Sequence, residues 1–75
     1  MDKGKRAIKK LAKRIRELRQ AKRWTQEECA DQAEMATAYL SGLERGVRNP
    51  TVKVLARLAH AFHVPISTLF EDSKD

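Results

Sequence analysis

The strongest constraint on this fold is the spacing of its apolar residues, which recur three and four positions apart in short segments. This period places them on one face of an α-helix and leaves the opposite face polar. The first segment contains Ile8, Leu11, Ala12, Ile15 and Leu18. Its spacing predicts a helix that runs to about Lys22. No stretch alternates apolar and polar residues over a useful length, so we expect no strands.

Residues that start and stop helices divide the rest of the chain. Thr25 and Glu28 have the spacing of a capping box, in which each side chain accepts a hydrogen bond from the other residue's backbone N–H. The helix that they open is predicted to end at Ala33–Glu34. A third helix is predicted over Ala36–Arg45, where Gly46 occupies the position at which glycine commonly ends a helix.

Two further helices are predicted towards the C-terminus. Thr51 is a candidate N-cap for a fourth amphipathic helix that ends near Phe62. Pro65 then fits the first turn of a short fifth helix. The sequence therefore predicts an all-α, compact five-helix domain. Its predicted divisions are a basic N-terminal arm with the start of the first helix over 1–14, the domain itself over 15–70, and a polar tail over 71–75.

Length and cysteine content limit the class of protein. A chain of 75 residues has room for one domain with a small core. Its single cysteine, Cys29, cannot form an internal disulfide, which favours a reducing compartment. No apolar run is long enough to cross a bilayer, and no signal-peptide pattern opens the chain. We therefore expect a cytoplasmic protein with no membrane partner.

Positive charge is concentrated at one end of the chain. Residues 1–23 contain eleven basic and two acidic residues, whereas residues 24–75 contain five basic and eight acidic ones. The total of +6 points to an anionic partner, nucleic acid before membrane. The alternative is a solubilising helix face. Basic residues in the first turn oppose the helix dipole, so Met1–Arg6 is predicted to fray into an arm whose Lys3, Lys5 and Arg6 either reach the DNA or remain solvated.

Several motifs together resemble the Cro/C1-type (XRE) helix-turn-helix family. They are IRELR at 15–19, WTQEECA at 24–30, YLSGLERG at 39–46, RNPT at 48–51 and VPISTLF at 64–70. The resemblance implies a phage-repressor-like domain that binds double-stranded DNA as a homodimer on a pseudo-palindromic operator and regulates transcription. It also implies a prokaryotic protein that is associated with the nucleoid. Within the family, Thr37–Asn49 is most similar to controller proteins of restriction–modification systems.

The resemblance also implies roles for individual residues. Residues 36–45 would form the recognition helix, and Arg19 and Glu44 would form an ion pair that ties it to the first helix. Gln26 would lie against a phosphate and brace the recognition helix. The positions that would face the major groove are Thr37, Ala38, Tyr39, Ser41 and Gly42. The residues that would grip the DNA backbone beside the groove are Arg45, Arg48 and Asn49.

The predicted recognition helix carries short side chains, whereas base readout usually uses Arg, Lys, Asn or Gln. We therefore expect specificity to rest on Thr37, Arg48 and DNA shape. Gly42 either allows close approach to DNA or simply weakens the helix, and Tyr39 either binds a phosphate or lines the core. The short side chains leave a second function open, an antitoxin-like protein-interaction module with little specific DNA binding.

Glycines that the family places at helix ends are absent, and Arg23, Glu34 and His63 occupy those positions. Either these turns differ locally or the domain accepts the strain and relies on dimerisation. The last helix offers apolar residues for such a dimer, although they could instead seal the monomer core. These candidate interface residues are Val64, Ile66, Leu69 and Phe70.

No pattern in the sequence supports catalysis or a cofactor. Cys29 falls at a core position, and Ser41 has no neighbouring base. His60 and His63 could share one face of a metal site, but no third ligand of suitable spacing accompanies them. We therefore expect no enzyme, no metal, no cofactor and no small-molecule ligand.

Overall fold

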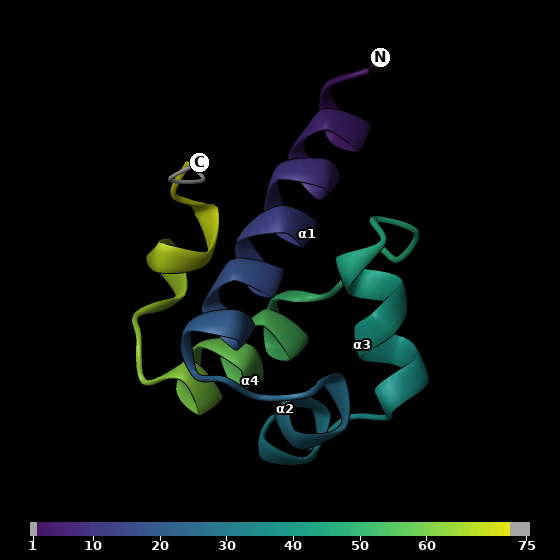
Figure 1. Cartoon of the computed structure of the whole chain (residues 1–75). Helices are drawn as coiled ribbons and strands as arrows, with labels where there is room; N and C mark the ends of the chain where they lie inside the picture. Colours follow the sequence, from purple (N-terminus) through teal and green to yellow (C-terminus); the bar gives the residue numbers. More distant parts are fainter. Residues whose placement is uncertain (1, 73–75) are drawn as a thin grey trace.

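The computed structural model describes residues 2–72, and every regular element in that range is helical (Figure 1). The elements are α1 (Lys3–Ala21), α2 (Gln26–Gln32), α3 (Thr37–Glu44), α4 (Val52–Phe62) and η1 (Ile66–Phe70). The all-α prediction is confirmed, with one difference in that the last element is a 3-10 helix. Most of the predicted polar tail, residues 73–75, lies outside the described residues.

The first helix begins earlier than predicted, so the expected frayed arm over Met1–Arg6 is wrong for its described part. Asp2 caps α1, because its Oδ1 accepts a hydrogen bond from the backbone N–H of Lys5 at 2.8 Å. The carboxylate also places negative charge at the positive end of the helix dipole, which offsets the basic residues of the first turn. The predicted caps of the later helices are present: Thr25 and Glu28 form the capping box of α2, and Thr51 caps α4.

Among residues 2–72, four adopt the left-handed backbone conformation at the ends of helices. Gly46 does so at φ 75°, without the steric cost that a Cβ brings. Arg23, Glu34 and His63 have φ values of 61°, 58° and 59°. The turns therefore keep the left-handed geometry without glycine, and each such residue costs about 1 kcal/mol or more.

The core lies where α1 crosses the other helices. Its fully buried side chains come from every element, and the largest are Ile15, Leu40, Leu58, Leu69 and Cys29. The half-buried Trp24 stacks on Phe62 at 6.0 Å between ring centroids, which closes the core beneath the turn between α1 and α2. Burial raises the pKa of the Cys29 thiol to about 11, so this cysteine is a neutral core residue at physiological pH.

Candidate nucleic-acid interface

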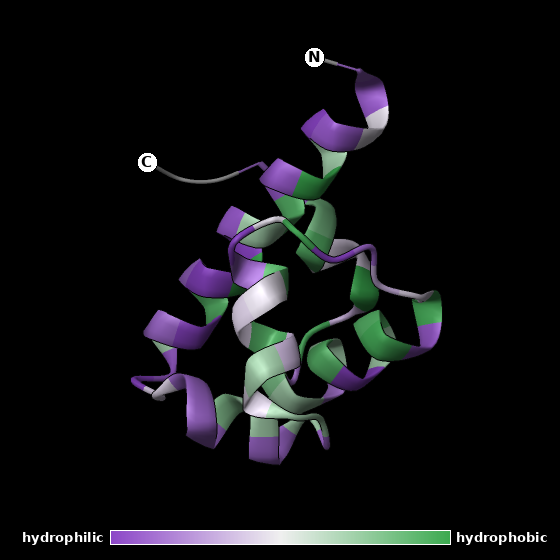
Figure 2. Ribbon diagram, turned by 90° about the vertical axis from the view of Figure 1, so that its right-hand side faces the viewer, coloured by the Kyte–Doolittle hydropathy of each residue, from purple (hydrophilic) through white to green (hydrophobic). Residues whose placement is uncertain are grey.

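The α2–α3 unit presents one side of α3 to solvent. Figure 2 views the molecule from the side on which α3 lies in Figure 1, with the pale ribbon of α3 beside the hydrophilic bands of α1. Thr37 and Ala38 are exposed at the start of α3, and Ser41 is half-buried one turn later. These side chains are short, so the backbone of α3 can come close to any surface that it contacts.

A buried ion pair holds the far end of α3. Glu44, whose side chain is fully buried, accepts hydrogen bonds from Nε and a terminal nitrogen of Arg19 at 2.7 and 3.0 Å. Gln26 donates to the same carboxylate at 3.1 Å. Arg19 also donates to the Trp24 carbonyl at 2.8 Å. The cluster therefore fixes α3 to α1 and to the start of α2.

The electrostatics of this cluster favour the charged form of Arg19. The hydrogen bond that Arg19 donates to Glu44 raises the pKa of the Arg19 guanidinium above its usual value. Arg16, which is half exposed, lies with its Nε 3.6 Å from a Glu44 oxygen and adds further positive charge nearby. Because no buried side-chain nitrogen or oxygen among the described residues lacks a hydrogen-bond partner, the desolvated carboxylate is well compensated.

The loop after α3 folds back on the helix through Arg48. Its guanidinium lies over the Tyr39 ring, 5.8 Å from the centroid. A Cβ added at Gly42 would lie 2.8 Å from Arg48 Cγ, which is closer than real Cβ contacts. The absence of a side chain at Gly42 therefore leaves room for Arg48, which the sequence did not indicate. Arg45 and Asn49 are exposed on the same segment.

Arg14 has a structural role that the sequence did not indicate, since there it counted only towards the positive charge of residues 1–23. Its side chain is buried and donates through Nε to the Thr68 carbonyl at 3.0 Å. Its terminal nitrogens pair with Glu17 at 3.4 Å and with Glu71 at 3.1 Å. The partners in η1 and beyond lie more than fifty positions away in sequence, so no local pattern indicates the contact.

The predicted dimer residues divide between core and surface. Leu69 is fully buried, and Val64 is half-buried against the core. Ile66 and Phe70 are 37% and 59% exposed, respectively. Ile66 and Phe70 of η1 are thus exposed to solvent, whereas Leu69 and Val64 help to close the core.

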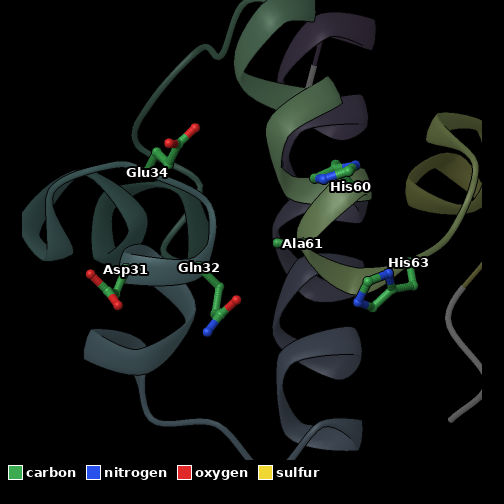
Figure 3. A pocket seen from close by; sticks show the side chains of 6 residues that line it. All are labelled: Asp31, Gln32, Glu34, His60, Ala61 and His63. Carbon is green, nitrogen blue, oxygen red and sulfur yellow. The ribbon is translucent and has the colours of Figure 1, made fainter.

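A shallow pocket lies between the end of α2 and α4. It is lined by His60 and His63 on one side and by Asp31 and Glu34 on the other (Figure 3). The histidine ring centroids are 6.4 Å apart. Within residues 2–72, no three histidine, cysteine or acidic side chains are arranged to hold a metal ion. Across the same range, the helices are too short or too polar to span a membrane.

Comparison with known proteins identifies relatives over most of the chain. A family model described as Helix-turn-helix matches residues 15–69. The chain is 39% identical over 62 residues to the HTH-type transcriptional regulator DdrOP3 of Deinococcus deserti, an alignment that covers 83% of this chain and 48% of that protein. The chain spans about half to three fifths of the length of the curated relatives that it matches.

Solved structures share the same arrangement of helices. The restriction–modification controller protein C.AhdI from Aeromonas hydrophila superposes with a TM-score of 0.82 at 36% identity, covering 84% of this chain and 96% of that one. SinR, a master regulator for biofilm formation, was solved in complex with DNA and superposes with a TM-score of 0.77 at 31% identity. That match covers 81% of this chain and 98% of the SinR chain.

Proposed function

This chain belongs to the helix-turn-helix family, and on that basis we propose that it binds operator DNA as a homodimer and regulates transcription, with α3 in the major groove. Relatives with solved structures include a controller of a restriction–modification system and a regulator solved in complex with DNA. We propose the same class of activity here, with a restriction–modification controller as the narrower assignment.

The observation that carries the proposal is the contrast between the two ends of α3. Its C-terminal Glu44 is buried and held by Arg19 and Gln26, whereas Thr37 and Ala38 at its start are exposed. A major groove about 12 Å wide admits an α-helix, and a rigidly held helix can present its exposed end at a fixed depth. The Glu44 cluster supplies that rigidity.

Several residues around α3 have side chains whose chemistry suits DNA. In our proposal, Thr37 donates a hydrogen bond to a base edge and packs its methyl group against thymine. The side-chain amide of Gln26 donates one N–H to Glu44, and its second N–H can donate to a phosphate. Arg45 and Asn49 hold the backbone beside the groove.

Arg48 is the long side chain that the recognition helix itself lacks. In the free protein it rests on Tyr39 and over Gly42. We propose that it leaves the Tyr39 ring to reach a base edge or a phosphate, and that the phenol then binds the neighbouring phosphate. With so few side chains for direct readout, DNA shape supplies the remaining specificity.

Homodimerisation is the second part of the proposal, and the exposed side chains of η1 support it. Ile66 and Phe70 offer exposed apolar surface at the two ends of one short element. Pairing two copies would present two α3 helices to half-sites about 34 Å apart on a pseudo-palindromic operator. Sedimentation of a Phe70→Ser variant tests this pairing, with a monomer expected where the parent protein is a dimer.

Fluorescence anisotropy with two duplexes tests the DNA-binding part of the proposal. One duplex carries the DNA upstream of the gene for this chain, and the other carries its scrambled sequence, each at two salt concentrations. We expect a preference of about 10³-fold or more for the upstream DNA, as for specific regulators. Thr37→Ala and Arg48→Ala should each reduce that preference. Equal, steeply salt-dependent binding to both duplexes would contradict the proposal and favour a protein-interaction module.

A further inference from the structure

Three basic residues of α1 line one face of the helix. Lys9, Lys13 and Arg16 are spaced four and three positions apart, which places them in a single row along the helix. All three are exposed. We call this row the α1 stripe.

The α1 stripe lines the same depression as the end of α3. The depression lies between Lys9, Lys13 and Arg16 on one side and Arg45 and Gly46 on the other. The turn at Gly46 rests on α1, since a Cβ at that glycine would lie 4.0 Å from Lys9 Cγ. In Figure 2 the hydrophilic bands of α1 run beside α3, which agrees with the contacts between these helices.

The other long cations of the middle of α1 face different directions. Arg14 is buried against η1, Arg19 is bound to Glu44, and Lys10 pairs with Asp72. The one acid lining the depression, Glu44, is fully buried, accepts hydrogen bonds from Arg19 and lies 3.6 Å from the Nε of Arg16. The surface of the depression is therefore dominated by positive charge from two elements, one of which ends in the proposed DNA-binding loop.

We propose that the α1 stripe binds the phosphodiester backbone of the operator beyond the base pairs that α3 covers. This inference rests on the proposed function, because it takes the duplex bound by α3 as the one that the stripe continues to follow. A row of lysine and arginine side chains matches a row of phosphates in charge, and its contacts are independent of base sequence. The stripe would therefore add affinity and length to the contact without adding specificity.

The test is a charge-matched pair of double variants. Lys9→Gln/Lys13→Gln removes two charges from the stripe, and the control Lys10→Gln/Arg57→Gln removes two exposed charges from outside it. Glutamine has nearly the helix propensity of lysine, so both variants should fold. Each protein is titrated over a range of salt concentrations against a duplex limited to the operator and against one extended by about ten base pairs, roughly one helical turn, at each end.

For the parent protein we expect tighter binding to the extended duplex at low salt. The stripe variant should lose this gain, and the slope of log K against log salt on the extended duplex should become less steep by about 2, since each phosphate contact contributes about 0.9. The control variant should retain the gain in affinity, and its slope should differ from that of the parent protein by no more than about 0.9, which corresponds to one phosphate contact. Preference for operator over scrambled DNA should be the same in all three proteins.

Two results would overturn the inference. Equal changes in both variants would show that net charge alone is responsible, and an unchanged stripe variant would show that the stripe does not touch the flanking DNA. Both results are interpreted under conditions in which the parent protein prefers its operator over the scrambled duplex. Failure of the proposed function is a different result, because the parent protein would then bind operator and scrambled duplexes equally.

Discussion

Arg14 and Arg19 lie on the same helix, are both largely withdrawn from solvent, and yet hold opposite sides of the molecule. Arg19 binds Glu44 and fixes the α3 side, which we propose faces DNA. Arg14 binds the Thr68 carbonyl and Glu71 and fixes η1, which we propose faces a second copy. Helix α1 is thus the common support of the two proposed interfaces.

The two arginines differ in the exposure of their partners. The Glu44 side chain is 0% exposed, whereas the Glu71 side chain is 58% exposed. A buried carboxylate that loses its arginine cannot recover its hydration, while an exposed one can. The contribution of a buried arginine to the free energy of unfolding should therefore depend on whether its acceptors are buried or exposed. Unfolding measurements on variants can test this.

The largest effect is expected from Arg19→Met. This change leaves the Glu44 charge buried, so the free energy of unfolding should fall by about 3–5 kcal/mol. Urea denaturation followed by circular dichroism measures it. Arg16→Gln is the control, because its side chain is 51% exposed and its contact with Glu44 is 3.6 Å long, so we expect a loss of at most about 1 kcal/mol. Equal losses in the two variants would contradict the importance of the buried pair.

Arg14→Met should have a smaller effect, about 1–2 kcal/mol, from the lost charged hydrogen bonds. Glu71 returns to water, and the Thr68 carbonyl still accepts a hydrogen bond from the Glu71 backbone N–H at 3.3 Å. The same urea titration compares it directly with Arg19→Met. A loss as large as that of the Arg19 variant would remove the distinction between the two sides.

Glycine at the strained turns should stabilise both sides alike, because the strain is local to the backbone. Arg23→Gly, on the α3 side, and His63→Gly, before η1, should each raise the free energy of unfolding by about 1 kcal/mol. Thermal melts of the two variants measure this. Gly46→Ala is the reverse control, and it should lower the melting temperature because its φ is also positive.

The last prediction concerns the pH dependence of stability that Cys29 causes, which does not appear at neutral pH. Burial raises the pKa of its thiol from 9.0 to about 11 in the folded chain, so the folded state keeps a proton that the unfolded chain loses. The stabilising contribution is complete below pH 9.0 and declines as pH rises towards about 11. Urea midpoints across this range should fall less steeply in Cys29→Ala than in the parent protein. Parallel slopes would argue against this titration.

The parts of the fold that depend on neighbouring residues were accessible from the sequence. Thr25 with Glu28, and Thr51, cap helices through contacts three residues away, so their spacing is sufficient. Asp2 caps α1 through a contact three residues away as well, but the basic residues around it led to the prediction of a frayed end. Long-range contacts leave no such signal, and the burial of Arg14 depends on a carbonyl that only the folded chain brings near.

The candidate site was accessible through two different routes. Pairing of Arg19 with Glu44 came from resemblance to a family, since nothing local links two residues 25 positions apart. Exposure of Thr37 and Ala38 follows from the helical period. The reason for Gly42 was missed, because the side chain that needs its space comes from the loop after the helix.

The contact of Gly42 with Arg48 also limits how this protein can diverge. Any side chain at position 42 would displace Arg48 from α3, since a Cβ there lies 3.2 Å or less from two Arg48 atoms. Because Arg48 is exposed, a larger residue at position 42 would turn its flexible side chain away from Tyr39. The glycine thus sets where Arg48 rests in the free protein, and a change at position 42 would alter the starting position of the side chain that we propose reaches DNA.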